Sequence, residues 1–197
     1  MLRYFGDLDF YVCITLLLAA LFVAWYRKRI LSYLFFFTLF SLYLLIALTQ
    51  VIFPFYIRTI ANDAPFRLTV NLIPFYFGSC QLLEICITQA LQNILLTIPF
   101  GFGLRFVASF KPRSIFRLAL LAGLSTEGLQ LLISLIFQSG FRAIDINDSL
   151  LNALGVLIGY ALFRIFAWGY LTILKRFTIQ PTGLFAYLCS VATDRLD

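Results

Sequence analysis

The sequence predicts an all-α integral membrane protein, a bundle of five transmembrane helices with the N-terminus outside and the C-terminus inside. Two observations predict this class. Of the 197 residues, 62% are hydrophobic and only 12% are charged, and a water-soluble domain of this length could not bury so much apolar surface. The apolar runs also approach the roughly 20 residues that a helix needs to cross a hydrocarbon core of about 30 Å.

The first two predicted helices cover residues 8–26 and 30–53. The first run is too long for the apolar part of a signal peptide, and its basic cluster at 27–29 follows it, which predicts a retained helix. The second run carries no charge and ends at Pro54. We expect residues 1–64 to form an N-terminal helical hairpin and the start of an outer loop.

The third predicted helix covers residues 89–110, after the longest non-spanning segment. The polar residues at 81–88 share one face, which leaves two alternatives. This stretch is either a separate helix in the membrane interface or an early, polar start of the third helix.

The last two predicted helices cover residues 114–137 and 149–170. The tail beyond them contains an apolar patch at 184–192 that is too short to span a bilayer. We expect this patch to lie on the membrane or to be disordered.

The distribution of basic residues predicts the orientation of the bundle. With the N-terminus outside, 11 of the 15 Lys and Arg residues fall on the inner side and four on the outer side. This is the positive-inside bias of membrane proteins. The net charge of +6 therefore indicates topology rather than a nucleic-acid surface, and no nucleic acid is expected as a partner.

The chain has no histidine and four cysteines. The absence of histidine excludes His-based acid–base catalysis, His metal ligation and a Ser/His triad. No Cys-x-x-Cys pair occurs, so neither a metal nor another cofactor is predicted. Cys80 and Cys86 can form a disulfide outside the cell, but small buried thiols are the favoured interpretation.

Polar and small residues form a stripe on each of the last two helices, with the spacing 0, 4, 7, 11 of one helical face. These stripes are Gly123, Glu127, Gln130 and Ser134, and Asp148, Asn152, Gly155 and Gly159. Because a short loop joins the helices, we expect the stripes to face each other. Counting about 1.5 Å per residue from the outer end places Glu127 about 15 Å deep, level with Gly155 to Gly159.

Each of these residues also has a purely structural interpretation. The two glycines can mark a close helix crossing, Asp145 and Asp148 can cap the fifth helix, and Asn71 can shape a turn. These alternatives leave Glu127 unexplained, because a carboxylate at mid-bilayer depth costs several kcal/mol unless it is paired, hydrated or protonated.

Four motifs occur in order: NLIPF at 71–75, NILLTIPFGF at 93–102, EGLQ at 127–130, and RAIDIND at 142–148, the last followed by Asn152, Gly155 and Gly159. With these motifs the chain resembles the VanZ-like family over about residues 65–165, with Thr97 where the family usually has an aromatic residue. We expect this stretch to be the VanZ-like core and 166–197 to be a cytoplasmic end and tail. The resemblance implies a bacterial cytoplasmic-membrane protein linked to the cell-envelope response to teicoplanin.

We therefore expect a polar pocket, open to the outside, that binds a lipid headgroup or a lipid-linked envelope intermediate. One alternative is an enzyme that modifies an envelope lipid through Glu127, Asp145 and Asp148, and another is a proton-coupled transporter. The oligomeric state is not predicted. The expected ligand-binding residues are Asn71, Asn93, Glu127, Gln130, Arg142, Asp145, Asp148 and Asn152.

Overall fold

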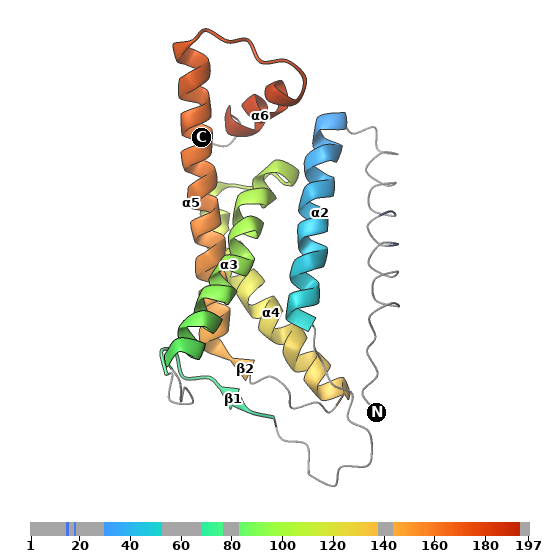
Figure 1. The fold of residues 1–197 in the computed structure, drawn as a ribbon, viewed down its shortest axis with the longest axis vertical. Coiled ribbons are helices and arrows are strands. Elements are labelled where there is room, and N and C mark those ends of the chain that lie inside the picture. The colour runs from blue at the N-terminus through green and yellow to red at the C-terminus, as the bar shows by residue number, and fades with distance from the viewer. Residues whose placement is uncertain are drawn as a thin grey trace.

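The protein is an elongated helical bundle (Figure 1). This computed structural model describes residues 15, 18, 30–52, 68–76, 83–137 and 144–193. The helices are α2 (Leu31–Ile52), α3 (Leu83–Val107), α4 (Ile115–Phe137), α5 (Ile146–Arg176) and α6 (Gly183–Thr193), with a short 3₁₀ turn, η1 (Pro112–Ser114), and two short strands, β1 (Val70–Asn71) and β2 (Ile144–Asp145).

Four of these helices, α2 to α5, are long and apolar enough to cross a membrane. They correspond to four of the five predicted spans. The remaining span, residues 8–26, lies outside the described residues except for Thr15 and Leu18. Helix α3 runs without a break from Leu83, so residues 83–88 are the start of the third helix rather than a separate interfacial helix. Residues 81 and 82 of the polar stretch lie outside the described residues.

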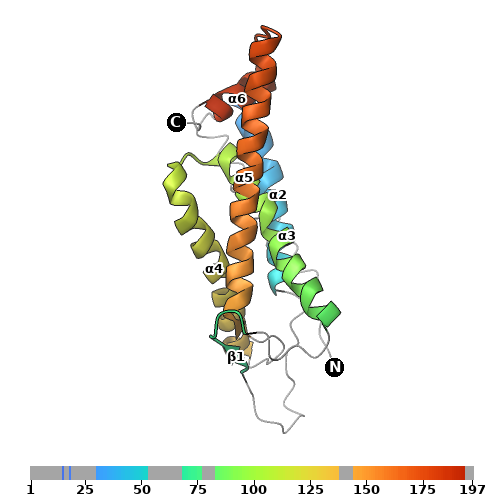
Figure 2. The same cartoon turned by 90° about the vertical axis from the view of Figure 1, so that its left-hand side faces the viewer.

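Helix α5 is the axis of the bundle. Figure 2 shows it between α3 and α4. It has 31 residues, which corresponds to about 46 Å of helix, and it extends beyond the predicted 149–170 at both ends. Because a bilayer core needs only about 20 residues, α5 is long enough to project from the membrane.

Glycines allow α3 and α5 to pack backbone against backbone. A Cβ atom added to Gly159 would lie 2.9 Å from both the carbonyl carbon of Ile98 and the amide nitrogen of Phe102. Gly155 faces Ile94 and Thr97 at the same close range, and Gly101 faces the backbone of Val156. The structural interpretation of the glycine pair is therefore confirmed, but the partner is α3 and not α4.

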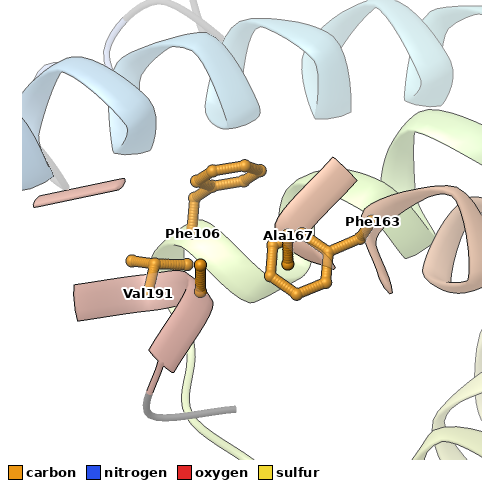
Figure 3. Close-up of a cluster of buried hydrophobic side chains, with 5 residues drawn as sticks. Phe106, Phe163, Ala167 and Val191 are labelled. Atoms are coloured by element: carbon orange, nitrogen blue, oxygen red, sulfur yellow. The ribbon is translucent and has the colours of Figure 1, made fainter. Parts of the chain in front are cut away.

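The tail forms a helix that folds back on the bundle. Phe106 of α3, Phe163 and Ala167 of α5, and Val191 and Ala192 of α6 form one buried cluster (Figure 3). The hydroxyl of Tyr187 donates to the carbonyl of Phe106. The expectation of a disordered patch at 184–192 is therefore wrong, because this patch buries part of its surface against α3 and α5.

The strands join two distant parts of the chain at the opposite end of the molecule (Figure 1). They pair in parallel, with Val70 opposite Ile144 and Asn71 opposite Asp145. The amide of Ile144 donates to the carbonyl of Thr69 at 2.9 Å. This pairing fixes the segment that precedes α3 against the start of α5.

Charges of opposite sign lie in opposite halves of the described bundle. The acidic residues lie toward the β1–β2 end, where the first turns of α3 and α5 carry Glu84 and Asp148. The last turns of the same two helices lie toward the other end and carry basic residues. The acidic set is Glu84, Glu127, Asp145 and Asp148, and the basic set is Arg105, Lys111, Arg113, Arg117, Arg164, Lys175 and Arg176.

Cys86, in the first turns of α3, is disulfide-bonded. Cys189 of α6, the other cysteine in the described ranges, is free. The partner of Cys86 therefore lies outside the described residues, and the expectation of a small buried thiol is wrong for Cys86.

Candidate functional site

The site lies where β1, β2 and α4 meet the start of α5. The side chain of Asn71 in β1 makes hydrogen bonds within the turn that follows β1 and also contacts Asp145 of β2. Its side-chain amide donates to Asp145 Oδ1 at 3.0 Å and to the carbonyl of Tyr76 at 3.0 Å, and its Oδ1 accepts from the amide of Ile73 at 3.1 Å. The predicted role of Asn71 in a turn is confirmed, and the same side chain contacts an acidic residue of the site.

Asp145 is the N-cap of α5. Its backbone is extended, with φ −128° and ψ 121°, and its Oδ1 accepts from the amide of Asn147 at 2.8 Å. The predicted capping role is therefore confirmed for Asp145. Asp148 is not the N-cap residue, but it lies in the first turn of α5, where a carboxylate interacts favourably with the helix dipole, as predicted.

Glu127 of α4 lies against this cap. It is 6% exposed, and its Oε2 accepts from the backbone amide of Asp145 at 3.1 Å. The predicted depth, level with Gly155 to Gly159, is wrong. The depth count assumed that α4 and α5 end at the same level, whereas α4 continues to Phe137, ten residues past Glu127, beyond the start of α5.

Farther along α5 from its N-cap, Asn152 connects α5 with both α3 and α4. Its side-chain amide donates to Thr126 Oγ1 of α4 at 3.0 Å. The backbone carbonyl of Asn152 accepts a hydrogen bond from Thr97 Oγ1 of α3 at 2.8 Å. Thr97, where the resemblance implies an aromatic residue, therefore makes a buried hydrogen bond between α3 and α5.

The VanZ/LLP1 family profile matches residues 40–167. The chain belongs to the VanZ/LLP1 family. No curated protein and no solved structure matches it. The family region begins within α2, ends within α5, and therefore includes all the hydrogen bonds of the site.

Not all the predicted residues of this VanZ/LLP1 protein meet at that site. Gln130 is buried but faces α2, where its side-chain amide lies 3.5 Å from the carbonyl of Val51. Asn93 is half-buried on α3, where its carbonyl accepts from Thr97 Oγ1 at 3.1 Å. Arg142 lies outside the described residues.

Asn147 is a site residue that the sequence analysis missed. It is 3% exposed. Its Oδ1 accepts from the amide of Phe75 at 2.6 Å, and its side-chain amide donates to the carbonyl of Tyr76 at 3.0 Å. Asn147 lies between Asp145 and Asp148 in the sequence, and this position could have indicated a role at the site. The motif was defined by the spacing of its acidic residues, so Asn147 was not considered as a site residue.

The site is rich in hydrogen-bond acceptors. Within the described ranges, no three His, Cys, Asp or Glu side chains lie close enough together to hold a metal ion. The carboxylates instead accept from backbone amides and from Asn71. The chemistry that the described groups support is the binding of hydrogen-bond donors.

Proposed function

We propose that this VanZ/LLP1 protein acts at the bacterial cytoplasmic membrane in the envelope response to glycopeptides such as teicoplanin. In this proposal, the acidic end of the bundle binds the polar part of an envelope lipid or of a lipid-linked envelope intermediate. The observation that carries the proposal is the hydrogen-bonded series Asn71–Asp145–Glu127 at the start of a membrane-spanning helix. Buried carboxylates in such helices are costly and most often serve function.

Two observations support an outward-facing site. The described basic residues lie in the opposite half of the bundle, and basic ends of membrane helices favour the cytoplasm. Cys86 is disulfide-bonded near the acidic end, and disulfides persist in oxidising compartments rather than in the bacterial cytosol. Both support the proposal that the carboxylates lie on the side where envelope intermediates meet glycopeptides.

The hydrogen-bond donors of such ligands suit this end of the bundle. Sugar hydroxyls and ammonium groups donate to carboxylate and amide oxygens. The short β1–β2 pairing holds Asn71 and Asp145 in one arrangement, so the polar atoms are preorganised and binding costs little conformational entropy.

The test is glycopeptide susceptibility in a strain that lacks the gene. We expect teicoplanin susceptibility to rise on deletion and to return to the original level with the wild-type gene. Complementation with Glu127→Gln should fail, because it replaces the buried carboxyl group with a neutral amide. Glu84→Gln is the matched control, since Glu84 is an exposed acidic residue in the first turn of α3, and it should complement fully.

Vancomycin should be measured in parallel, and the lipids of each strain should be profiled by mass spectrometry. Unchanged susceptibility to both drugs in the deletion strain would rule out the glycopeptide role. A modified lipid that disappears in the deletion strain would instead favour an enzyme that acts on that lipid.

A further inference from the structure

The segment from β1 to the turn after it, residues 70–76, exposes a run of apolar side chains. We call this segment the β1 turn. Phe75 is 80% exposed and Leu72 is 70% exposed, and the β1 turn carries no charge. Its other exposed large hydrophobic residues are Val70, Ile73 and Tyr76. A contiguous apolar surface of this kind marks a contact with a protein, a ligand or a membrane.

The backbone polar groups of the β1 turn have partners within the protein. The amide of Ile73 donates to Asn71 Oδ1 at 3.1 Å, and the amide of Phe75 donates to Asn147 Oδ1 at 2.6 Å. The carbonyl of Tyr76 accepts from the side-chain amides of both asparagines, each at 3.0 Å. The amide of Tyr76 donates to the carbonyl of Ile73 at 3.3 Å. Irregular backbone near hydrocarbon needs such partners, because water is not available there to bond it.

Phe75 is held in a backbone conformation that bulky residues rarely adopt. Its φ is 62°, in the left-handed region. Such a conformation persists only where the surrounding contacts stabilise it, and it is most common at functional sites. Here the contact is the bond from the Phe75 amide to Asn147, a residue that is 3% exposed. The fold therefore fixes the backbone of Phe75 and leaves its ring outside.

The apolar surface continues from the β1 turn onto two membrane-spanning helices. Both views show β1 at the end of the bundle where α3 begins and α4 ends (Figure 1 and Figure 2). Helix α3 exposes Ile85 and Ile87 in its first turns. Helix α4 exposes Leu135 and Ile136 in its last turn. Apolar side chains on the outside of spanning helices face lipid, so the β1 turn adjoins the lipid-facing surface.

We propose that the β1 turn, held by Asn71 and Asn147, inserts its apolar side chains into the membrane interface at the acidic end of the bundle. Tyr76 suits this place, because tyrosine is enriched at the boundary between lipid and water. Insertion holds the neighbouring pair of Asn71 and Asp145 at the level of the lipid headgroups. The inference goes beyond the proposed function, and it requires neither a glycopeptide role nor a particular orientation of the bundle.

The experiment measures the depth of a tryptophan in the full chain in phosphatidylcholine nanodiscs. The chain has two tryptophans, Trp25 and Trp168, which are replaced by phenylalanine, and Phe75→Trp is then added. Lipids brominated near the headgroup or near the chain ends quench the fluorescence at two depths, and aqueous acrylamide quenches it from water. We expect the emission of Phe75→Trp to be reduced by both brominated lipids, and more by bromines near the headgroup.

Two variants in the same background calibrate this signal. Leu124→Trp lies near the middle of α4 at an exposed position, so bromines near the chain ends should quench it most. Gln180→Trp lies in the exposed segment beyond α5, so acrylamide should quench it and the brominated lipids should not. The circular dichroism of each variant is first compared with that of the wild type, which checks that the fold is retained.

A second variant tests how the β1 turn is held. Asn147→Ala, added to Phe75→Trp, leaves the amide of residue 75 and the carbonyl of Tyr76 with fewer hydrogen bonds. Because unbonded polar groups are costly in lipid, the turn should move toward water. Lipid quenching should then fall and acrylamide quenching should rise, while the helix content stays the same.

Two results would overturn the proposed insertion. Acrylamide quenching of Phe75→Trp that equals that of Gln180→Trp, without lipid quenching, would place the turn in water. No quenching by lipid or by acrylamide would mean that protein covers the turn, as in an assembly with a second copy of the chain. Unchanged lipid quenching in Asn147→Ala would refute the positioning role of Asn147. Glycopeptide susceptibility does not enter any of these measurements, so the proposed function is tested separately.

Discussion

Gly159→Ala should destabilise the protein by separating α3 from α5. The added methyl group would lie 2.9 Å from the carbonyl carbon of Ile98 and from the amide nitrogen of Phe102. The carbonyl oxygen of Ile98 would lie closer still. Carbon contacts are most favourable at roughly 3.5–4.0 Å, so the two backbones must move apart by more than about 0.6 Å. Because both contacts are with backbone atoms, no side-chain rotation can relieve them.

The cost follows from two opposing terms. Overpacking a tight interface costs about 1–3 kcal/mol, and rigid backbone on both sides favours the upper part of that range. Replacing Gly by Ala inside a helix recovers at most about 1 kcal/mol. We therefore expect the free energy of unfolding to fall by about 2 kcal/mol.

The assay is equilibrium unfolding of the purified protein in mixed micelles, followed by circular dichroism. Gly169→Ala is the matched control, because Gly169 lies in the same helix and an added Cβ would meet nothing within 4 Å. This control should be as stable as the wild type or slightly more stable. If Gly159→Ala proves as stable as Gly169→Ala, the close α3–α5 contact described above is wrong.

Three further predictions test the site, its helix cap and its orientation. Thr97→Val, which keeps the side-chain shape but removes the bond to the Asn152 carbonyl, should cost about 1 kcal/mol in the same unfolding assay; no change would mean that the bond contributes nothing. Asp145→Ala should cost about 1 kcal/mol through loss of the helix cap, and Asp145→Asn should restore most of it, whereas equal losses in both would point to the charge instead. A membrane-impermeant maleimide should label Cys189 only in inverted vesicles. It should label Cys86 in intact cells only after the disulfide is reduced. The reverse pattern would indicate the opposite orientation of the protein in the membrane.

Four spanning helices were predictable from local chemistry. A run of about 20 apolar residues has one stable solution in a bilayer, because its backbone must satisfy its own hydrogen bonds. The capping role of Asp145 was predictable for a similar reason, since a short acidic side chain before a helix satisfies the first amides. The polar set around Glu127 was identified because such residues are rare in apolar segments.

The tail shows where local chemistry was insufficient. An apolar patch of nine residues at 184–192 is too short to span a bilayer, and its composition is equally compatible with a membrane surface, disorder or packing. The structure packs it as α6, because Val191 and Ala192 complete a cluster with Phe106 and Phe163. The sequence contains no signal for contacts between residues so far apart in the chain.

The sequence by itself determined that Glu127, Asp145 and Asn152 belong to helices that meet in a membrane-spanning bundle. Only the tertiary structure decided that Glu127 lies against the cap of α5 and that Gly159 contacts α3. The physical reason is that helical periodicity shows which residues share a face. It contains no information on which neighbour that face contacts, or on how far one helix is shifted along the other.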